Sequence, residues 1–227
     1  MPLETVERLA RALAPHGLIY RGGFHPRPAD GVPTRPDGAG VATVVMIGNA
    51  GPALWAAFAA SPEHRAGARH ALDAWTRRIV GDIAPAFGAA ACHPFDGPPH
   101  LPFQRWALRA DTVWVSPLQI LIHPEYGLWH AYRAALLFAA RVALPGIDRR
   151  ERPCDGCAAQ PCLTACPVAA FTPAGYAAER CRQHVQSAPG RPCLATGCLA
   201  RQACPVGRPY RYAPAQAEWH MRGFLGG

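Results

Sequence analysis

Apolar residues recur at two spacings along the first two thirds of the chain, and each spacing predicts one kind of element. A spacing of three to four residues, as in Val6, Leu9 and Leu13, marks one face of a helix. A run rich in β-branched residues, such as residues 41–47, is typical of a buried strand. The patterns predict helices over residues 3–14, 52–60, 63–87 and 102–110, and strands over 18–24, 41–47, 89–92, 113–115 and 118–122. Residues 128–144 stay ambiguous, because their alanines favour a helix while their aromatic and β-branched residues suit a strand.

The composition changes at Pro145-Gly146, and we place a domain boundary there. Before it, helices and strands alternate, which predicts an α/β or α+β domain over residues 1–147 with a long loop at 25–40. After it, cysteine, proline and arginine dominate residues 148–213, which are expected to form a small second domain. Residues 214–227 are expected to form a loosely packed tail.

The charge and the pattern of the first residues argue against a nucleic-acid-binding, secreted or membrane protein. The formal net charge is +8, and all 23 basic residues are arginines, dispersed rather than gathered in a run that would bind nucleic acid. The chain does not open with a basic segment followed by an apolar one, and no stretch approaches about 18 apolar residues, so neither a secretory signal nor a membrane span is expected. We therefore expect a cytoplasmic protein, in which thiols stay reduced and clustered cysteines indicate a metal rather than disulfides.

Eight of the nine cysteines follow a pattern typical of iron–sulfur proteins. The first run is Cys154-x2-Cys157-x4-Cys162-x3-Cys166-Pro167, Cys181 stands alone, and the second run is Cys193-x4-Cys198-x5-Cys204-Pro205. In two-cluster ferredoxins the cysteine before proline ligates the other cluster. Applied to this chain, that rule predicts two [4Fe–4S] clusters, one held by Cys154, Cys157, Cys162 and Cys204 and the other by Cys166, Cys181, Cys193 and Cys198.

Two zinc sites of four cysteines each would use the same set of residues. Structural zinc favours paired cysteines two to four residues apart, whereas Cys-Pro endings are typical of ferredoxins, so we predict iron–sulfur clusters. The runs differ from the ferredoxin pattern in two places, with four residues before Cys162 and five before Cys204. The ninth cysteine, Cys92, is expected to be a small buried apolar residue.

Segments on both sides of the boundary resemble known cobalamin proteins. The segment Ile122-His123-Pro124-Glu125-Tyr126-Gly127-Leu128-Trp129-His130-Ala131-Tyr132-Arg133 and the stretch Cys92-His93-Pro94 resemble CblC-type cobalamin-processing proteins. The cysteine runs, and Asp96-Gly97-Pro98-Pro99 with the helix that follows it, are similar to epoxyqueuosine reductase, which joins a CblC-like domain to two [4Fe–4S] clusters. The resemblance implies a nitroreductase-derived α+β domain that binds base-off cobalamin, followed by a small bacterial ferredoxin-like domain.

The resemblance also indicates site residues, each of which has an ordinary structural alternative. Asp96 is the candidate proton donor, a role that requires a pKa raised by burial; otherwise it is a turn residue. His93 and His123 are candidate corrin contacts or, because each precedes proline, caps of turns. Tyr126 and Trp129 are expected to pack against the corrin or in the core.

Arg133 is the remaining candidate for cofactor or substrate binding. It lies within an apolar stretch, where an unpaired charge is costly. We expect it to have an anionic partner, which is either a carboxylate of the protein or one of the substrate or glutathione.

Three functions fit these expectations. The first is a cobalamin-dependent reductase or cobalamin-processing enzyme, in which a donor such as ferredoxin or flavodoxin supplies electrons through two clusters to cobalamin and a small-molecule substrate. The alternative is a ferredoxin-like electron-transfer protein without cobalamin or catalysis of its own. The third is a tRNA-modifying enzyme. A tRNA partner is not expected, because the basic charge is diffuse and the Gly-Trp-x-Gly-Lys turn of epoxyqueuosine reductase is absent at Trp114-Val115-Ser116.

Overall fold

The structure, a computed structural model, describes residues 4–226 and divides into two compact units. Unit 1 takes the chain up to Thr112 and then Ala131–Arg149, and unit 2 takes Val113–His130 and the chain from Arg150 onward. The predicted boundary at residue 147 lies close to the second of these crossings. The first crossing was not predicted, because the segment 113–130 has the same apolar pattern as the residues before it.

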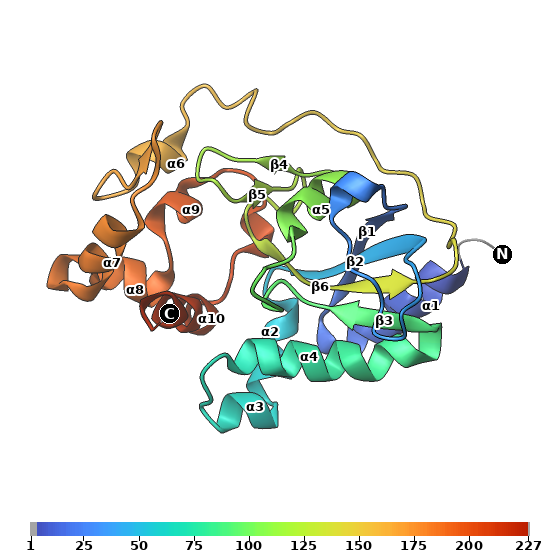
Figure 1. The fold of residues 1–227 in the computed structure, drawn as a ribbon. Coiled ribbons are helices and arrows are strands. Elements are labelled where there is room, and N and C mark those ends of the chain that lie inside the picture. The colour runs from blue at the N-terminus through green and yellow to red at the C-terminus, as the bar shows by residue number, and fades with distance from the viewer. Residues whose placement is uncertain (1–3, 227) are drawn as a thin grey trace. The chain divides into compact units, whose positions relative to one another are not determined.

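Unit 1 is built on a four-stranded sheet with the strand order β1-β2-β6-β3 (Figure 1). Its strands are β1 (Ile19–Phe24), β2 (Thr43–Ala50), β3 (Ala89–Cys92) and β6 (His130–Phe138). β1 pairs with β2, and β3 with β6, in antiparallel fashion. β6 resolves the ambiguity of residues 128–144 in favour of a strand, and Ala134–Phe138 are buried along it.

The helices of unit 1 bury one face each. They are α1 (Glu4–Leu13), α2 (Ala53–Ala59), α3 (Pro62–Arg65), α4 (Ala71–Ile83) and α5 (Phe103–Ala110), with 3₁₀ turns at Ala14–His16, Pro28–Asp30 and Ala84–Phe87. α1 buries Val6, Leu9 and Leu13 at helical spacing, as predicted. α5 buries Phe103 and Trp106 in a core shared with strand residues such as Met46.

The single helix predicted over residues 63–87 is wrong. The chain forms α3, breaks, forms α4 and ends in a 3₁₀ turn that contains Pro85. The break contains two residues with left-handed backbone, Gly67 (φ 61°) and His70 (φ 60°), which an α-helix does not accommodate. The apolar spacing that predicted this helix, at Leu72, Trp75, Ile79 and Val80, lies entirely within α4 and gave no information on residues 63–70.

Unit 2 consists of short helices and two small hairpins. The first hairpin is β4 (Trp114–Val115) with β5 (Leu121–Ile122), and the second is β7 (Phe171–Thr172) with β8 (Gly175–Tyr176). The helices are α6 (Pro161–Thr164), α7 (Ala178–Gln186), α8 (Arg191–Thr196), α9 (Leu199–Ala203) and α10 (Pro214–Leu225), with 3₁₀ turns at Ala188–Gly190 and Arg208–Tyr210. β5 is shorter than predicted, because Ser116–Ile120 closes the turn of the first hairpin.

The loosely packed tail predicted for residues 214–227 is also wrong over residues 214–225, and residue 227 lies outside the described residues. Residues 214–225 form the helix α10, which packs against α8 and α7. Gln216 and Ala217 of α10 are buried. Within residues 4–226, no helix is both long enough and apolar enough to cross a membrane.

Candidate metal centre

The eight predicted ligands lie together in two groups within unit 2. Burial raises the pKa of the Cys162 thiol, and Cys204 and Cys157 close by raise it further. Burial also raises the pKa of the Cys154 thiol, and Cys204, Cys162 and Cys157 nearby raise it further. These residues are called here the first cysteine group: Cys154, Cys157, Cys162 and Cys204.

The second cysteine group consists of Cys166, Cys181, Cys193 and Cys198. Burial raises the pKa of the Cys198 thiol, as do Cys181 and Cys193 nearby, and the pKa of Cys193 responds in turn to Cys181 and Cys166. All four line one small cavity of about 20 Å³. Most of its other walls are apolar, from side chains such as Phe171, Val185 and Met221.

Apolar packing and a close backbone contact hold the first group. Cys162 and Cys204 lie in a buried cluster with Leu118, Ile122 and Leu128 of the segment 113–130. Gly127 has φ 58°, and a Cβ atom on it would lie 2.1 Å from the Val206 carbonyl oxygen. The turn at residues 123–127 therefore presses directly on the backbone that follows Cys204, which explains why this segment belongs to unit 2.

Hydrogen-bond donors approach every sulfur of the second group. The Ala170 N–H donates to Cys166 Sγ at 3.3 Å, the Leu199 N–H to Cys193, and the Ala200 and Arg201 N–H groups to Cys198. The Tyr176 hydroxyl donates to Cys181, and burial and this bond raise the pKa of Tyr176. Donors around all four sulfurs suit thiolates, which need compensation for their charge when buried.

Each cysteine group offers four sulfur donors, the number that one iron–sulfur cube or one zinc ion takes. Among the described residues, no three His, Cys, Asp or Glu side chains meet at one metal-binding point. In a four-iron cube each thiolate binds a different iron, whereas a zinc ion takes all four thiolates itself.

Cys92 lies outside both groups. It is 6% exposed in the core of unit 1 beside Phe24 and Met46. Burial raises its pKa to about 12, so the thiol stays protonated at neutral pH. This is the small buried residue that the sequence predicted.

Asp96 sits in a tight turn in which it binds His93. Its Oδ2 accepts from the His93 N–H at 2.7 Å and lies 3.3 Å from His93 Nδ1, and its Oδ1 accepts from Arg77 at 2.8 Å. Burial acts to raise the pKa of Asp96, but the bond from His93 and the charges of His93 and Arg77 outweigh burial and lower it. The raised pKa expected of a proton donor is therefore wrong, because the sequence did not reveal Arg77 as a partner.

His93 is the buried member of this pair. It is 2% exposed and stacks on Phe95, and burial lowers its pKa, which favours the neutral imidazole. Its Nε2 atom has no hydrogen-bond partner among residues 4–226. A buried polar atom without a partner costs about 1–3 kcal/mol, so this nitrogen is suited to meet a ligand.

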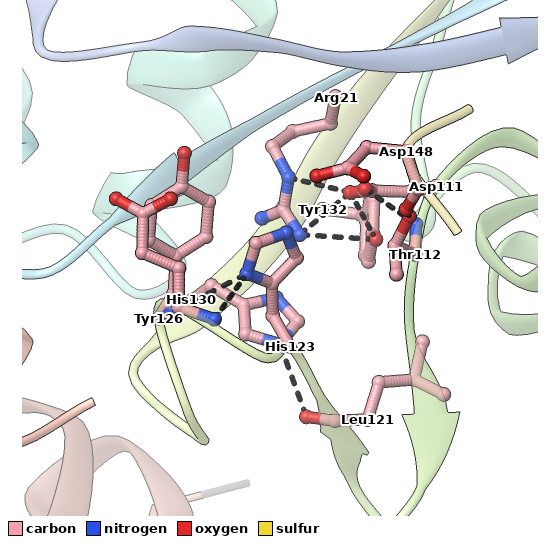
Figure 2. A network of polar contacts seen from close by, with 10 residues as sticks. Arg21, Asp111, Thr112, Leu121, His123, Tyr126, His130, Tyr132 and Asp148 are labelled. Carbon is pink, nitrogen blue, oxygen red and sulfur yellow. Dashed lines mark hydrogen bonds and ion pairs between the residues drawn. The ribbon is translucent and has the colours of Figure 1, made fainter. Parts of the chain in front are cut away.

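The other predicted cofactor contacts have partners inside the protein. His123 Nδ1 accepts from the N–H groups of Glu125 and Tyr126, so it caps its own turn, and its ring stacks on Tyr126 at 4.2 Å (Figure 2). Trp129 is 2% exposed and packs edge-on against Tyr212. In the structure His123 thus caps its own turn and Trp129 packs against another side chain, and contact of either residue with a corrin stays a prediction.

Arg133 has the anionic partner that its apolar surroundings required. Its Nη2 donates to Asp73 at 2.8 Å and lies 3.4 Å from the Thr76 hydroxyl oxygen. The partner is therefore a carboxylate of the protein, from α4. Arg133 belongs to unit 1, as does His93, whereas His123, Tyr126 and Trp129 belong to unit 2.

A buried polar network in unit 1 was not predicted. Arg21 is 2% exposed and donates to Asp111 at 2.7 Å and to the Tyr132 hydroxyl at 3.1 Å, and Tyr132 donates to Asp111 at 2.9 Å (Figure 2). Arg21 and Asp111 are 90 positions apart, so no local pattern could pair them. Thr112 extends the network by donating to the backbone of Asp148.

Comparison with known proteins identifies the fold. No protein-family model matches the sequence, and no curated protein matches it. Among solved structures, a Caenorhabditis elegans B12-trafficking protein, CblC, matches with a TM-score of 0.53 at 14% identity, over 99% of this chain and 96% of that one. This chain has a CblC-like fold. The comparison confirms the predicted resemblance and the mixed α+β fold. The ferredoxin-type character of residues 148–213 stays a prediction.

Epoxyqueuosine reductases match more weakly. The enzyme bound to a tRNA-Tyr stem loop matches with a TM-score of 0.49 at 15% identity, over 92% of this chain and 66% of that one. The Streptococcus thermophilus enzyme matches with a TM-score of 0.47 at 16% identity, over 78% of this chain and 53% of that one. The CblC-like chain thus spans about half to two thirds of the length of these reductases.

Proposed function

We propose that this protein is an iron–sulfur redox protein that delivers low-potential electrons to a base-off cobalamin, for reduction of a small molecule or for processing of the cobalamin itself. The observation that carries the proposal is the separation of eight cysteines into two groups of four within unit 2. When bound, two [4Fe–4S] clusters would supply electrons at roughly −400 mV, low enough to serve a cobalt centre without a strong lower ligand.

The residues of the chain have defined tasks in this proposal. The first and second cysteine groups hold the metal, and the apolar walls at Phe171, Val185 and Met221 exclude water from it. The N–H groups and the Tyr176 hydroxyl stabilise the thiolates by hydrogen bonds. Asp96 orients the neutral His93 ring, whose Nε2 is the atom we assign to contact with the corrin.

The proposal includes an electron donor and a cellular compartment. The net charge of +8 favours an acidic electron donor such as a ferredoxin or flavodoxin. Clustered cysteines that bind metal fit a reducing compartment such as the cytoplasm, where thiols stay reduced. We propose no tRNA partner.

One pair of variants tests the metal centre. Cys204→Ser removes a ligand of the first group, so the reconstituted protein should retain about four of eight iron atoms. The matched control is Cys92→Ala, which changes a buried cysteine outside both groups and should leave the iron content unchanged. If both variants retained the full iron content, Cys204 would not be a ligand.

A second candidate function is electron transfer without cobalamin, and two observations favour it. Arg133 is already paired with Asp73, and His123 caps its own turn. Titration of the reconstituted protein with cob(II)alamin distinguishes the two functions. The proposal predicts a cobalt EPR signal of the base-off form, and the absence of binding at micromolar concentrations would leave the second candidate.

A further inference from the structure

His184 contributes an imidazole to the wall of the second cysteine cavity. It lies on α7 three positions after Cys181, so the two side chains share a face of the helix. It lines the same cavity as Cys166, Cys193 and Cys198. Sequence analysis did not select His184, because its position in the cavity depends on how α7 packs against α8 and α10.

The Nε2 atom of this imidazole needs a partner. It is buried and has no hydrogen-bond partner within residues 4–226. A buried polar atom that is left without a partner destabilises the folded protein. The cavity beside His184 is lined by the four sulfurs and by side chains that are largely apolar, so sulfur is the partner that the site offers.

The end of α7 is held firmly, which keeps His184 in the cavity wall. Its carbonyl oxygen accepts from the Ser187 N–H at 2.9 Å and from the Ser187 hydroxyl at 2.7 Å. A Cβ atom on Gly190 would lie 1.8 Å from this same oxygen, so the chain returns in direct contact with the helix end. These contacts hold the backbone of His184 at the end of α7, beside the cavity that its side chain lines.

We propose that His184 is a positioning residue that donates its Nε2–H to a sulfur of the cluster held by the second cysteine group, and that it thereby raises the reduction potential of this cluster above that of the other. The inference rests on the proposed function. Reduction adds one negative charge to the cluster, and a donor to its sulfurs stabilises the reduced form more than the oxidised one. Together with the Tyr176 hydroxyl, His184 gives the second group two side-chain donors.

The direction of electron flow follows from this asymmetry. Electrons move spontaneously from the couple of lower potential to the couple of higher potential. If a donor reduces the cluster of the first group, the electron would therefore reside mainly on the cluster of the second group at equilibrium. His184 would be one of the residues that set this order.

The test compares three variants of the reconstituted full-length protein by EPR-monitored redox titration. His184→Phe keeps the ring volume and removes the donor. His184→Gln keeps an N–H donor. Gln183→Leu is the matched control, since Gln183 neighbours His184 on α7 but is exposed and bonds Glu179 at 3.0 Å.

For His184→Phe we expect the reduced-to-oxidised ratio of one cluster to fall about tenfold at a fixed potential, which equals about 59 mV for one electron. The other cluster should be unchanged, His184→Gln should regain most of the shift, and Gln183→Leu should behave as the parent. Unchanged potentials in His184→Phe, or equal shifts in His184→Phe and His184→Gln, would overturn the inference. Loss of four iron atoms from His184→Phe would overturn it in favour of direct ligation by His184.

The iron content of the parent protein distinguishes a failure of the inference about His184 from a failure of the proposed function. If the parent holds both clusters and His184→Phe shows no shift, the inference fails while the proposed function stands. If the parent holds no iron, the proposed function fails and the inference fails with it.

Discussion

Arg201 offers a direct test of how the segment 113–130 is joined to the cysteine-rich part of unit 2. It lies on α9, the short helix between Cys198 of the second group and Cys204 of the first. Its guanidinium donates from Nε to the Leu128 carbonyl oxygen at 3.0 Å and from Nη2 to the same oxygen. It also lies over the rings of Trp129 at 4.5 Å and Tyr212 at 4.6 Å.

The expected cost of Arg201→Ala can be worked out from these contacts. Hydrogen bonds from a charged group contribute about 1.5–3 kcal/mol, and a cation over an aromatic ring contributes about 0.5–2 kcal/mol depending on burial. Because these interactions share one side chain, they do not add fully, and we expect a loss of about 3 kcal/mol. For a chain of this size that corresponds to a fall in Tm of roughly 6–12 °C.

Thermal unfolding followed by circular dichroism and tryptophan fluorescence measures this loss. The matched control is Arg222→Ala on α10, because Arg222 binds Glu218 in a pair whose side chains are 66% and 38% exposed. Exposed pairs contribute about 0–1 kcal/mol, so the control should lower Tm by no more than a few degrees. Equal effects of the two variants would refute the view that Arg201 fastens Leu128 to α9.

Three further predictions follow from other contacts. Because the pKa of Asp96 is lowered in the folded state, its stabilisation is present above about pH 4 and is lost as the pH falls through the folded pKa. Asp96→Asn should therefore be less stable than the parent at pH 7, and the difference in denaturation midpoint should shrink towards pH 3; a difference that grows on acidification would contradict the lowered pKa. Arg133→Ala removes the guanidinium that binds Asp73 and should cost about 2 kcal/mol in urea unfolding, whereas no change would show that the pair is dispensable. Truncation after residue 212 removes α10, including the Met221 wall of the second cavity, and should leave about four iron atoms in the first group; full retention would show that α10 is not needed to enclose the site.

The parts of the fold that were predicted correctly depend on short stretches of sequence. The apolar runs that became β1, β2 and β3, and the helical spacing that became α1 and α5, specify their elements without distant partners. The rule that a cysteine before proline crosses to the other cluster depends only on the order of the cysteines, and the ligand sets that it gives stay a prediction. In the structure Cys204 lies near Cys154, Cys157 and Cys162, the residues with which the rule groups it.

The parts that could not be predicted depend on contacts between distant residues. α10 is held by packing against α8, and the ambiguous residues of β6 became a strand through their pairing with β3. The lowered pKa of Asp96 depends on Arg77, which is 19 positions away on α4. Arg21 and Asp111, and the imidazole of His184 in the cysteine cavity, likewise carry no signal in their own neighbourhood.

The iron and acid-labile sulfide content of the full chain, reconstituted under anaerobic conditions, tests the central claim most directly. Two groups of four cysteines predict about eight iron and eight sulfide per chain, with an EPR signal of reduced [4Fe–4S] clusters on addition of dithionite. Two zinc ions per chain, with neither iron nor sulfide, would contradict the account.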